Sequence, residues 1–401
     1  QETVPFTDET HAVSSNELDL VWEVYCYDHP EFFWLSAYNY EFGKGKVKNV
    51  FLTYALAGDE LTAARTAFNA ATEEALSGIT ADMDDLAKEI YLHDYLANKV
   101  TYVAAANAHN AYGALVEGQA VCEGYSRAFQ HLLLQVGIPC YVVLGTGKGQ
   151  PHMWNLVKIN GEYYHVDLTW DDGNNGTYYA YFNVTTEQIL ENHTITVPIH
   201  GIPTPPCTAT AANYFEVYGG KMASGDVDTI CAMLDNPDLF ARIYITGDPD
   251  AFLTWLQSNL EAIIDNANVS GNVSCSYNYS GREFQIHLYG DYAHTHNMTH
   301  VDALAATCQS EGNVEYWVCS KCNLQFADAA GTTELTNVKT EIDPTNHVGG
   351  IHMENASDPN CTVPGNTGDT YCNSCNTKLK DGQAIPAAVS YTHLTLPTIR
   401  L

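Results

Sequence analysis

The stretch AYGALVEGQAVCEGYSRAFQHLLLQVGIPCYVV, residues 111–143, decides the fold of the region around it. From Cys122 onward its apolar residues recur on one stripe at helical spacing, and Gly137 and Pro139 end the pattern. The period then changes to two, which predicts a buried strand over residues 140–144. Cys122 therefore begins a helix, where the first-turn amides and the helix dipole favour its thiolate.

Two strand-like runs follow and are joined by Asn160-Gly161, a strong signal for a two-residue hairpin turn. In that register His152 lies opposite Thr169. His152 and Asp167 are then diagonal neighbours on one face of the sheet, with Cα atoms about 7–8 Å apart. A three-residue loop would turn the side chains of the second strand to the opposite face of the sheet and would separate His152 from Asp167.

Cys122, His152 and Asp167 together have the composition of a catalytic triad. A cysteine nucleophile needs a histidine that takes its proton and a carboxylate that fixes the imidazole tautomer. The oxyanion would be held by the Cys122 amide and a second donor that the sequence does not identify. Trp154 has two interpretations, a substrate-binding wall of the acyl pocket or a core packing residue. The alternative for the whole set is an ordinary polar cluster on a half-exposed sheet.

Three blocks resemble the bacterial branch of the transglutaminase-like superfamily, namely residues 111–143, HMWN at 152–155 and YYHVDLTWDD at 163–172. The likeness covers about residues 60–181. It implies an α+β, papain-like core in which the helix bearing Cys122 packs on an antiparallel sheet. The family includes protein cross-linkers, deamidases, peptidases and domains that have lost activity.

The 401 residues are expected to form several regions. A Pro-rich stretch, residues 198–206, is the first boundary, and residues 389–401 look like a translated sequencing adapter and are left out of the fold. Strands are expected at 214–217, 241–246 and 284–288, and helices at 226–234 and 250–265. The predicted regions are an N-terminal extension (1–59), the transglutaminase-like domain (60–200), a small α+β domain (208–292), and two Cys-rich modules (294–347 and a truncated 348–388).

Half of the twelve cysteines lie beyond residue 294 and form an internal duplication. Within each set the cysteines are separated by ten residues and then by two, and the second set follows the first at a constant offset (361 − 308 = 53). The sets are Cys308, Cys319 and Cys322, then Cys361, Cys372 and Cys375.

Each set has a histidine upstream, His300 in the first and His352 in the second. Three thiolates and one imidazole would complete a tetrahedral zinc site, and the closing C-x-x-C is half of such a knuckle. His347 is an alternative ligand for the first copy. Disulfides and a redox pair are the rival interpretations. The modules resemble Cys-rich repeats of bacterial surface proteins.

The formal net charge is −31, with 17 Lys plus Arg against 48 Asp plus Glu. This charge argues against nucleic acid and anionic membranes as partners. No uncharged apolar run reaches the roughly 18 residues that a membrane helix needs. The acidic, lysine-poor composition and the family likeness predict a protein outside a bacterial cell or on its surface, with possible attachment to the cell wall.

The first hypothesis is a thiol enzyme that acts on protein or peptide amides through an acyl-enzyme, as a peptidase, deamidase or cross-linking acyltransferase. Catalysis would need no cofactor, and zinc is expected in the C-terminal modules alone. The second hypothesis is a catalytically silent surface interaction protein that uses the same fold as a scaffold.

Overall fold

The computed structural model describes residues 2–5, 13–173, 176–196 and 203–388. It divides into a first unit, residues 1–234 with 238–291, and a second unit, residues 235–237 with 292–401. Part of the predicted Pro-rich boundary and the adapter-like residues 389–401 lie outside the described residues. Among the described residues, none of the helices combines the length and apolarity that crossing a membrane requires.

The N-terminal region, predicted as an extension without assigned structure, contains a helix and a three-stranded sheet of order β1-β3-β2. The Ser14 hydroxyl caps the helix by accepting a hydrogen bond from the Glu17 amide. Leu18 then packs against Val47 and Val50. These elements are β1 (Glu2–Pro5), α1 (Ser15–Asp28), β2 (Leu35–Gly43) and β3 (Lys46–Tyr54).

Two helices, one on each side of residue 80, precede a third that begins at Cys122 as the sequence predicts. The apolar stripe of the third helix is fully buried and includes Tyr125, Phe129 and Leu132. Its burial supplies much of the core because each such side chain contributes about 1.5–3 kcal/mol. The helical elements are α2 (Gly58–Leu76), α3 (Asp85–Lys99), the π-helical turn η2 (Gly113–Glu117) and α4 (Cys122–Gln135).

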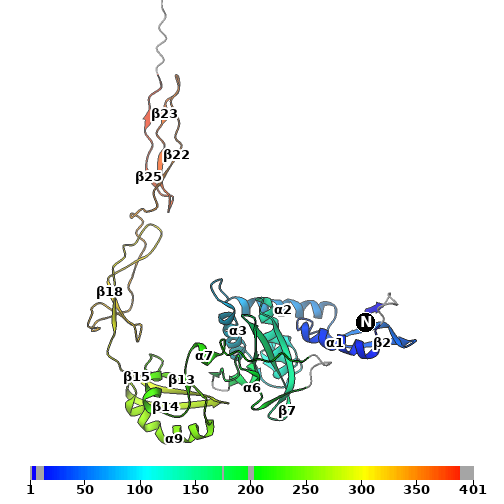
Figure 1. Cartoon of the computed structure of the whole chain (residues 1–401). Helices are drawn as coiled ribbons and strands as arrows, with labels where there is room; N and C mark the ends of the chain where they lie inside the picture. Colours follow the sequence, from blue (N-terminus) through cyan, green and yellow to red (C-terminus); the bar gives the residue numbers. More distant parts are fainter. Residues whose placement is uncertain (1, 6–12, 174–175, 197–202, 389–401) are drawn as a thin grey trace, which may run out of the picture. The chain divides into compact units, whose positions relative to one another are not determined.

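An antiparallel sheet of order β11-β6-β7-β8 packs against α4 (Figure 1). The predicted hairpin register is confirmed from the pair Ile159–Glu162 to the pair Asn155–Val166. The turn residues Asn160 and Gly161 have φ angles of 52° and 90°, the left-handed values that this turn needs. The strands are β6 (Cys140–Gly147), β7 (Gln150–Ile159), β8 (Glu162–Val166) and β11 (His193–Ile195).

The second strand of the hairpin, predicted to run from Glu162 to Leu168, ends at Val166, two residues earlier. Asp167 is the N-cap of the short helix α5 (Leu168–Asp171), so the ladder does not continue to the predicted pair of His152 and Thr169. Short elements connect this region: the parallel pair β4 (Thr101–Tyr102) and β5 (Gln119–Ala120), then β9 (Asp172–Gly173), β10 (Gly176–Thr177) and α6 (Thr186–Ile189).

The segment predicted as a small α+β domain lies in the first unit and contains a sheet of order β12-β13-β15-β14. The strand predicted at 214–217 is wrong: this segment is a helix, because the Asn213 side chain accepts a hydrogen bond from the Phe215 amide and caps it. The elements are α7 (Tyr214–Val217), β12 (Lys221–Met222), α8 (Val227–Leu234), β13 (Phe240–Ile245), α9 (Pro249–Asn266), β14 (Val269–Ser280) and β15 (Glu283–Tyr292).

The small domain is joined to the rest of the first unit through Glu283. Its buried carboxylate accepts a hydrogen bond from the Tyr179 amide and pairs with Arg242. Arg242 in turn donates to the Thr177 carbonyl. These contacts hold the segment 177–181, which matters because the Asp167 amide donates to the Tyr181 carbonyl.

The second unit repeats its strands at the offset of 53 residues seen in the sequence, as in β16 and β22 or β18 and β24. The first copy contains β16 (Met298–Val301), β17 (Gly312–Asn313), β18 (Tyr316–Cys319), β19 (Gln325–Phe326), β20 (Glu334–Leu335) and β21 (Lys339–Thr340). The second contains β22 (Ile351–Glu354), β23 (Gly365–Asn366), β24 (Asp369–Cys372), β25 (Lys378–Lys380) and β26 (Ala384–Ile385).

Candidate active site

Cys122 is the first residue of α4 and is partly exposed. The chain before it is anchored, since the Val121 amide donates to the Ala108 carbonyl. The helix start also lies very close to that loop, because a Cβ on Gly124 would come within 2.3 Å of the Ala108 oxygen. No side chain caps the helix, so its first-turn amides face the thiol side and favour a negative charge there.

His152, on β7, lies between the thiol and a carboxylate. Its Nε2 is 2.7 Å from Oδ2 of Asp167, and Cys122 is within hydrogen-bonding reach. Because Nε2 is engaged, Nδ1 is the nitrogen that remains for the thiol. Burial disfavours the imidazolium, but hydrogen bonds to Asp167 and Cys122 outweigh it and raise the pKa of His152 to about 10. The imidazole therefore holds its proton firmly.

Asp167 is fully buried at the N-terminus of α5. Its Oδ1 accepts a hydrogen bond from the Trp170 amide at 3.3 Å, which leaves Oδ2 for the imidazole of His152. Burial raises the pKa of a carboxyl group, but here the hydrogen bonds from His152 and His193 outweigh burial and lower it. Asp167 is thus held as a carboxylate.

His193 is a site residue that sequence reasoning missed. It lies on β11 opposite Gly147, is buried, and places Nε2 3.0 Å from Oδ2 of Asp167. Its other nitrogen, Nδ1, is 2.6 Å from Oδ1 of Asn192. A three-residue strand in a segment without a motif carries no sequence signal that could have indicated this contact.

Tyr102 is the second residue that sequence reasoning left unassigned, although it lies within residues 60–181, which the family likeness covers. The parallel pairing of β4 with β5 places Tyr102 beside Ala120, two residues before Cys122. Burial, and then the nearby Cys122 and Asp167, raise the pKa of the Tyr102 hydroxyl. The phenol thus stays protonated beside the Cys122 amide.

Trp154 is fully buried, which favours the packing interpretation over the predicted substrate-binding wall. Its indole N–H donates to Nδ1 of His165 at 3.0 Å, and its ring lies 6.1 Å from that of His152. Trp170 is the aromatic residue on the other side, 5.5 Å from His152 and 4.3 Å from His193 between ring centroids. The imidazoles are therefore enclosed by aromatic rings that restrict their orientation.

His152, Asp167 and His193 also have the separation that a metal ion would need, with one ligand atom from each lying within 4.8 Å of the others. Their contacts in the structure are direct hydrogen bonds through one carboxylate oxygen. This arrangement fixes the orientation of the His152 imidazole, which faces Cys122, and favours its protonated form.

The second unit groups the predicted metal ligands differently from the sequence prediction. His300 is 2.8 Å from a Glu315 oxygen, and His352 is 2.8 Å from the Asn373 side-chain oxygen. The reason is strand register: His300 lies opposite Trp317, two pairs away from Cys319 at the end of its strand. Neither histidine joins a cysteine cluster among the described residues.

Two other clusters of possible ligands are present instead. The first cluster combines two histidines that precede β16 with the C-x-x-C pair of the first repeat. The second cluster combines one histidine with cysteines from both repeats. Cys361, predicted as a ligand, is exposed and lies in neither cluster. The clusters are His294, His296, Cys319 and Cys322, then Cys308, His347, Cys372 and Cys375.

A nucleophile-bearing helix packed on an antiparallel sheet with a His–carboxylate pair is the arrangement of papain-like thiol enzymes in general. Residues 73–168 match the sequence model of the transglutaminase-like superfamily. This part of the chain is therefore a transglutaminase-like domain, as the sequence blocks predict. No curated protein matches the chain.

Solved structures similar to the chain include a TGase, with a TM-score of 0.24 and 15% identity over 42% of this chain and 50% of the other. A candidate cysteine protease from Cytophaga hutchinsonii has a TM-score of 0.23 and 15% identity over 33% and 54%. A candidate protease from Parabacteroides distasonis has a TM-score of 0.23 and 10% identity over 64% and 62%. The chain thus spans less than two thirds of the length of each of these structures.

Proposed function

We propose that the protein is a thiol enzyme that transfers acyl groups from protein or peptide amides through Cys122. The observation that carries the proposal is the shared contact of three side chains from separate elements: Cys122 on α4, His152 on β7 and Asp167 at the start of α5. Such convergence is what nucleophilic catalysis by cysteine requires.

In the proposed reaction the thiol proton already resides on Nδ1 of His152, and the Cys122 thiolate attacks the amide carbonyl carbon. The Cys122 amide and the Tyr102 hydroxyl donate to the oxyanion that forms. When the C–N bond breaks, the His152 imidazolium gives its proton to the leaving amine and a thioester remains. Water or a primary amine then attacks the thioester and releases the thiol, so the acceptor decides between hydrolysis and cross-linking.

The same domain has a rival role as a catalytically silent scaffold in a surface interaction protein. The scaffold role is supported by the second unit, whose duplicated strands would suit attachment of the protein to a surface rather than catalysis. The presence of Cys122, His152 and Asp167 at the three positions that thiol catalysis needs favours the enzyme.

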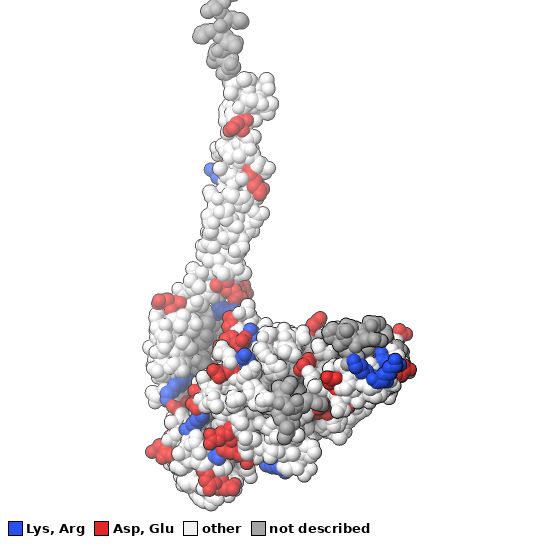
Figure 2. Space-filling view, turned by 45° about the vertical axis from the view of Figure 1, so that its right-hand side comes forward, with Lys and Arg blue, Asp and Glu red and all other residues white. Residues whose placement is uncertain are grey.

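We also propose that the protein acts outside a bacterial cell, at the cell surface. The support is compositional: the net charge is −31, and Figure 2 shows Asp and Glu spread over the visible face with patches of Lys and Arg between them. Fractionation of the source cells tests this, because recovery in the cytosolic fraction would contradict it.

The activity is tested with the purified full chain, a Gln-containing protein and a labelled primary amine, with peptide fragments analysed in parallel. We expect labelled protein or fragments from the wild type, none from Cys122→Ser, and unchanged yield from Cys275→Ser, a matched control at a partly exposed free cysteine of the same unit. Equal yields from Cys122→Ser and wild type would overturn the proposal. No product with any acceptor would favour the scaffold.

A further inference from the structure

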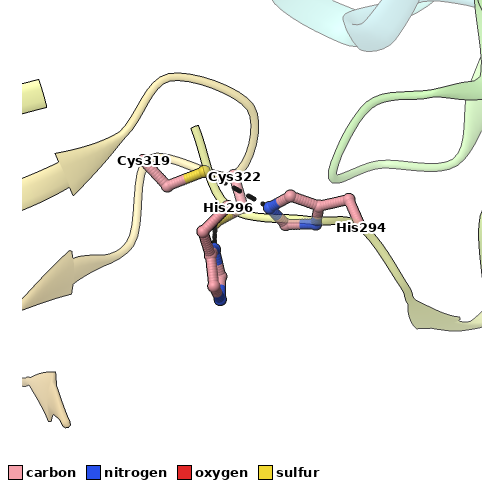
Figure 3. Close-up of side chains that lie close together, drawn as sticks. All are labelled: His294, His296, Cys319 and Cys322. Atoms are coloured by element: carbon pink, nitrogen blue, oxygen red, sulfur yellow. Dashed lines mark hydrogen bonds between the residues drawn. The ribbon is translucent and has the colours of Figure 1, made fainter. Parts of the chain in front are cut away.

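The first cluster in the second unit has the geometry of a four-ligand metal site. Nε2 of His294 is 3.3 Å from the Cys319 sulfur, and Nδ1 of His296 is 3.7 Å from the Cys322 sulfur. Figure 3 shows the two imidazoles and the two sulfurs directed toward a common point. The Lys321 amide also donates to the Cys319 sulfur at 3.4 Å, which supports a thiolate.

The second cluster repeats this geometry with one ligand exchanged. Nδ1 of His347 is 3.3 Å from the Cys375 sulfur, and the sulfurs of Cys308 and Cys372 are 3.9 Å apart. At the offset of 53 residues, His347, Cys372 and Cys375 replace His294, Cys319 and Cys322. The position equivalent to His296 is Gly349, so this site lacks its own fourth ligand.

Cys308 supplies that fourth ligand from the first repeat, 64 residues before Cys372. Its position is fixed by the segment next to His347, because the Cys308 amide donates to the Asn346 carbonyl at 2.9 Å. The Asn346 side chain donates back to the Ala306 carbonyl at 2.6 Å. The second cluster is therefore built from both repeats.

These separations fit a tetrahedral zinc ion. Zn–S bonds near 2.3 Å and Zn–N bonds near 2.0–2.1 Å place ligand atoms about 3.3–3.8 Å apart, whereas a disulfide would hold two sulfurs about 2.0 Å apart. The second unit also needs a stabilising ion, because the buried apolar residues described after residue 292 are few and half of them are ligands. They are Cys319, Phe326, Val338 and Cys372.

We propose that the second unit binds two zinc ions, one through two His and two Cys and one through one His and three Cys, and that the second ion joins the two repeats. The proposal does not depend on the activity of the first unit. Both sites are closed, four-ligand sites of the structural kind, so binding stabilises the fold of the second unit.

The test begins with metal analysis of the full chain purified with zinc present, where we expect two zinc ions per chain. Cys308→Ser should retain one, whereas the matched control Cys361→Ser should retain two. His347→Asn should also lose one ion, and His352→Asn none. Loss of an ion from Cys361→Ser and not from Cys308→Ser would overturn the shared site, and fewer than one ion in the wild type would overturn both sites.

A measurement on the wild type avoids variants that fail to fold. N-ethylmaleimide labelling followed by mass spectrometry should modify Cys361 at once and the five ligand cysteines only after zinc is removed by a chelator. A disulfide between Cys308 and Cys372, or equal labelling of all six cysteines before chelation, would contradict the proposal.

Discussion

The charge of Asp167 is shared between two imidazoles through a single oxygen, Oδ2. His152 lies between this oxygen and the thiol, whereas His193 approaches from β11 and contacts neither the thiol nor solvent. His193 therefore acts through Asp167: it fixes the carboxylate and holds its pKa low. A hydrogen bond to a charged group contributes about 1.5–3 kcal/mol, so this positioning has a measurable effect.

Replacing His193 by Ala should lower kcat about 10- to 100-fold with little change in KM. Because one of the two imidazole partners of Asp167 is lost, the pKa of Asp167 rises and the acid limb of the pH–rate profile should move to higher pH. His193→Gln keeps a donor and should recover part of the rate. An unchanged acid limb in His193→Ala would contradict this role, and the measurement is kcat and kcat/KM between pH 4 and 9.

Replacing Tyr102 by Phe removes the proposed second oxyanion donor and keeps the ring. We expect kcat to fall about 100-fold, the usual cost of one such donor. Tyr218→Phe is the matched control, since Tyr218 is 60% exposed against 58% for Tyr102 and lies in the same unit. Steady-state kinetics that show the same small change for both variants would remove Tyr102 from the mechanism.

Glu89 is a fully buried carboxyl group whose Oε2 accepts a hydrogen bond from Asn183 at 2.8 Å. Burial raises its pKa to about 8. A raised folded-state pKa stabilises the fold below about pH 4.5, and this contribution is lost as the pH rises to about 8. The wild type should therefore lose stability relative to Glu89→Gln between pH 5 and 8, by at most about 1.4 kcal/mol per pH unit. Urea unfolding that shows parallel pH dependence for both would contradict this.

At the scale of elements, the β7–β8 hairpin sets the geometry of the site. The two-residue turn at Asn160-Gly161 determines which side chains of β8 face those of β7. It leaves Asp167 at the end of β8, where α5 begins and the carboxylate turns toward His152. The contact between His152 and Asp167 thus depends on the length of the turn rather than on the side chains of the turn residues.

Insertion of one Gly between Asn160 and Gly161 should abolish activity, because the facing of β8 is reversed. Gly161→Ala is the control: its φ of 90° strains an L residue, yet no atom lies within 4 Å of the added Cβ. It should cost about 1 kcal/mol of unfolding free energy and leave activity in place. Circular dichroism and turnover should be measured on both, and full activity in the insertion variant would sink the register argument.

The sequence predicts those elements whose signal is local. The α4 stripe, the hairpin turn and the triad follow from residue spacing, and so does the duplication of the second unit. His193 and Tyr102 could not be placed, since strand pairing between distant segments brings them to the site. The helix at 214–217 depends on the Asn213 side-chain cap, whereas three of its four residues are aromatic or β-branched and favour a strand. The sequence groups possible metal ligands by their proximity along the chain. It therefore cannot show that Cys308 lies beside His347, Cys372 and Cys375 of the following repeat.

Across the chain as a whole, the proposed catalytic residues and the proposed zinc sites lie in different units. Cys122, His152 and Asp167 all lie in the first unit, and both proposed zinc sites lie in the second. The hydrogen bonds from the Tyr179 amide to Glu283 and from Arg242 to the Thr177 carbonyl join the small α+β domain to the rest of the first unit. Its contacts support the segment that holds the Asp167 backbone.

Removal of zinc by 1,10-phenanthroline should therefore leave the activity of the first unit intact while the second unit loses stability. We expect unchanged amide turnover and faster proteolysis after residue 292, followed by mass spectrometry of the fragments. EDTA-treated Cys308→Ser gives a parallel control. Loss of turnover together with zinc would show that the units are coupled.

The central claim is that His152 and Asp167 keep Cys122 activated. It is tested most directly by the rate at which iodoacetamide alkylates Cys122 between pH 5 and 9, followed by peptide mass spectrometry. The wild type should react at pH 6 far faster than its other partly exposed cysteines, and His152→Ala should lose this advantage. A Cys122 that reacts no faster than Cys275 in the wild type, or equally fast in His152→Ala, would contradict the account.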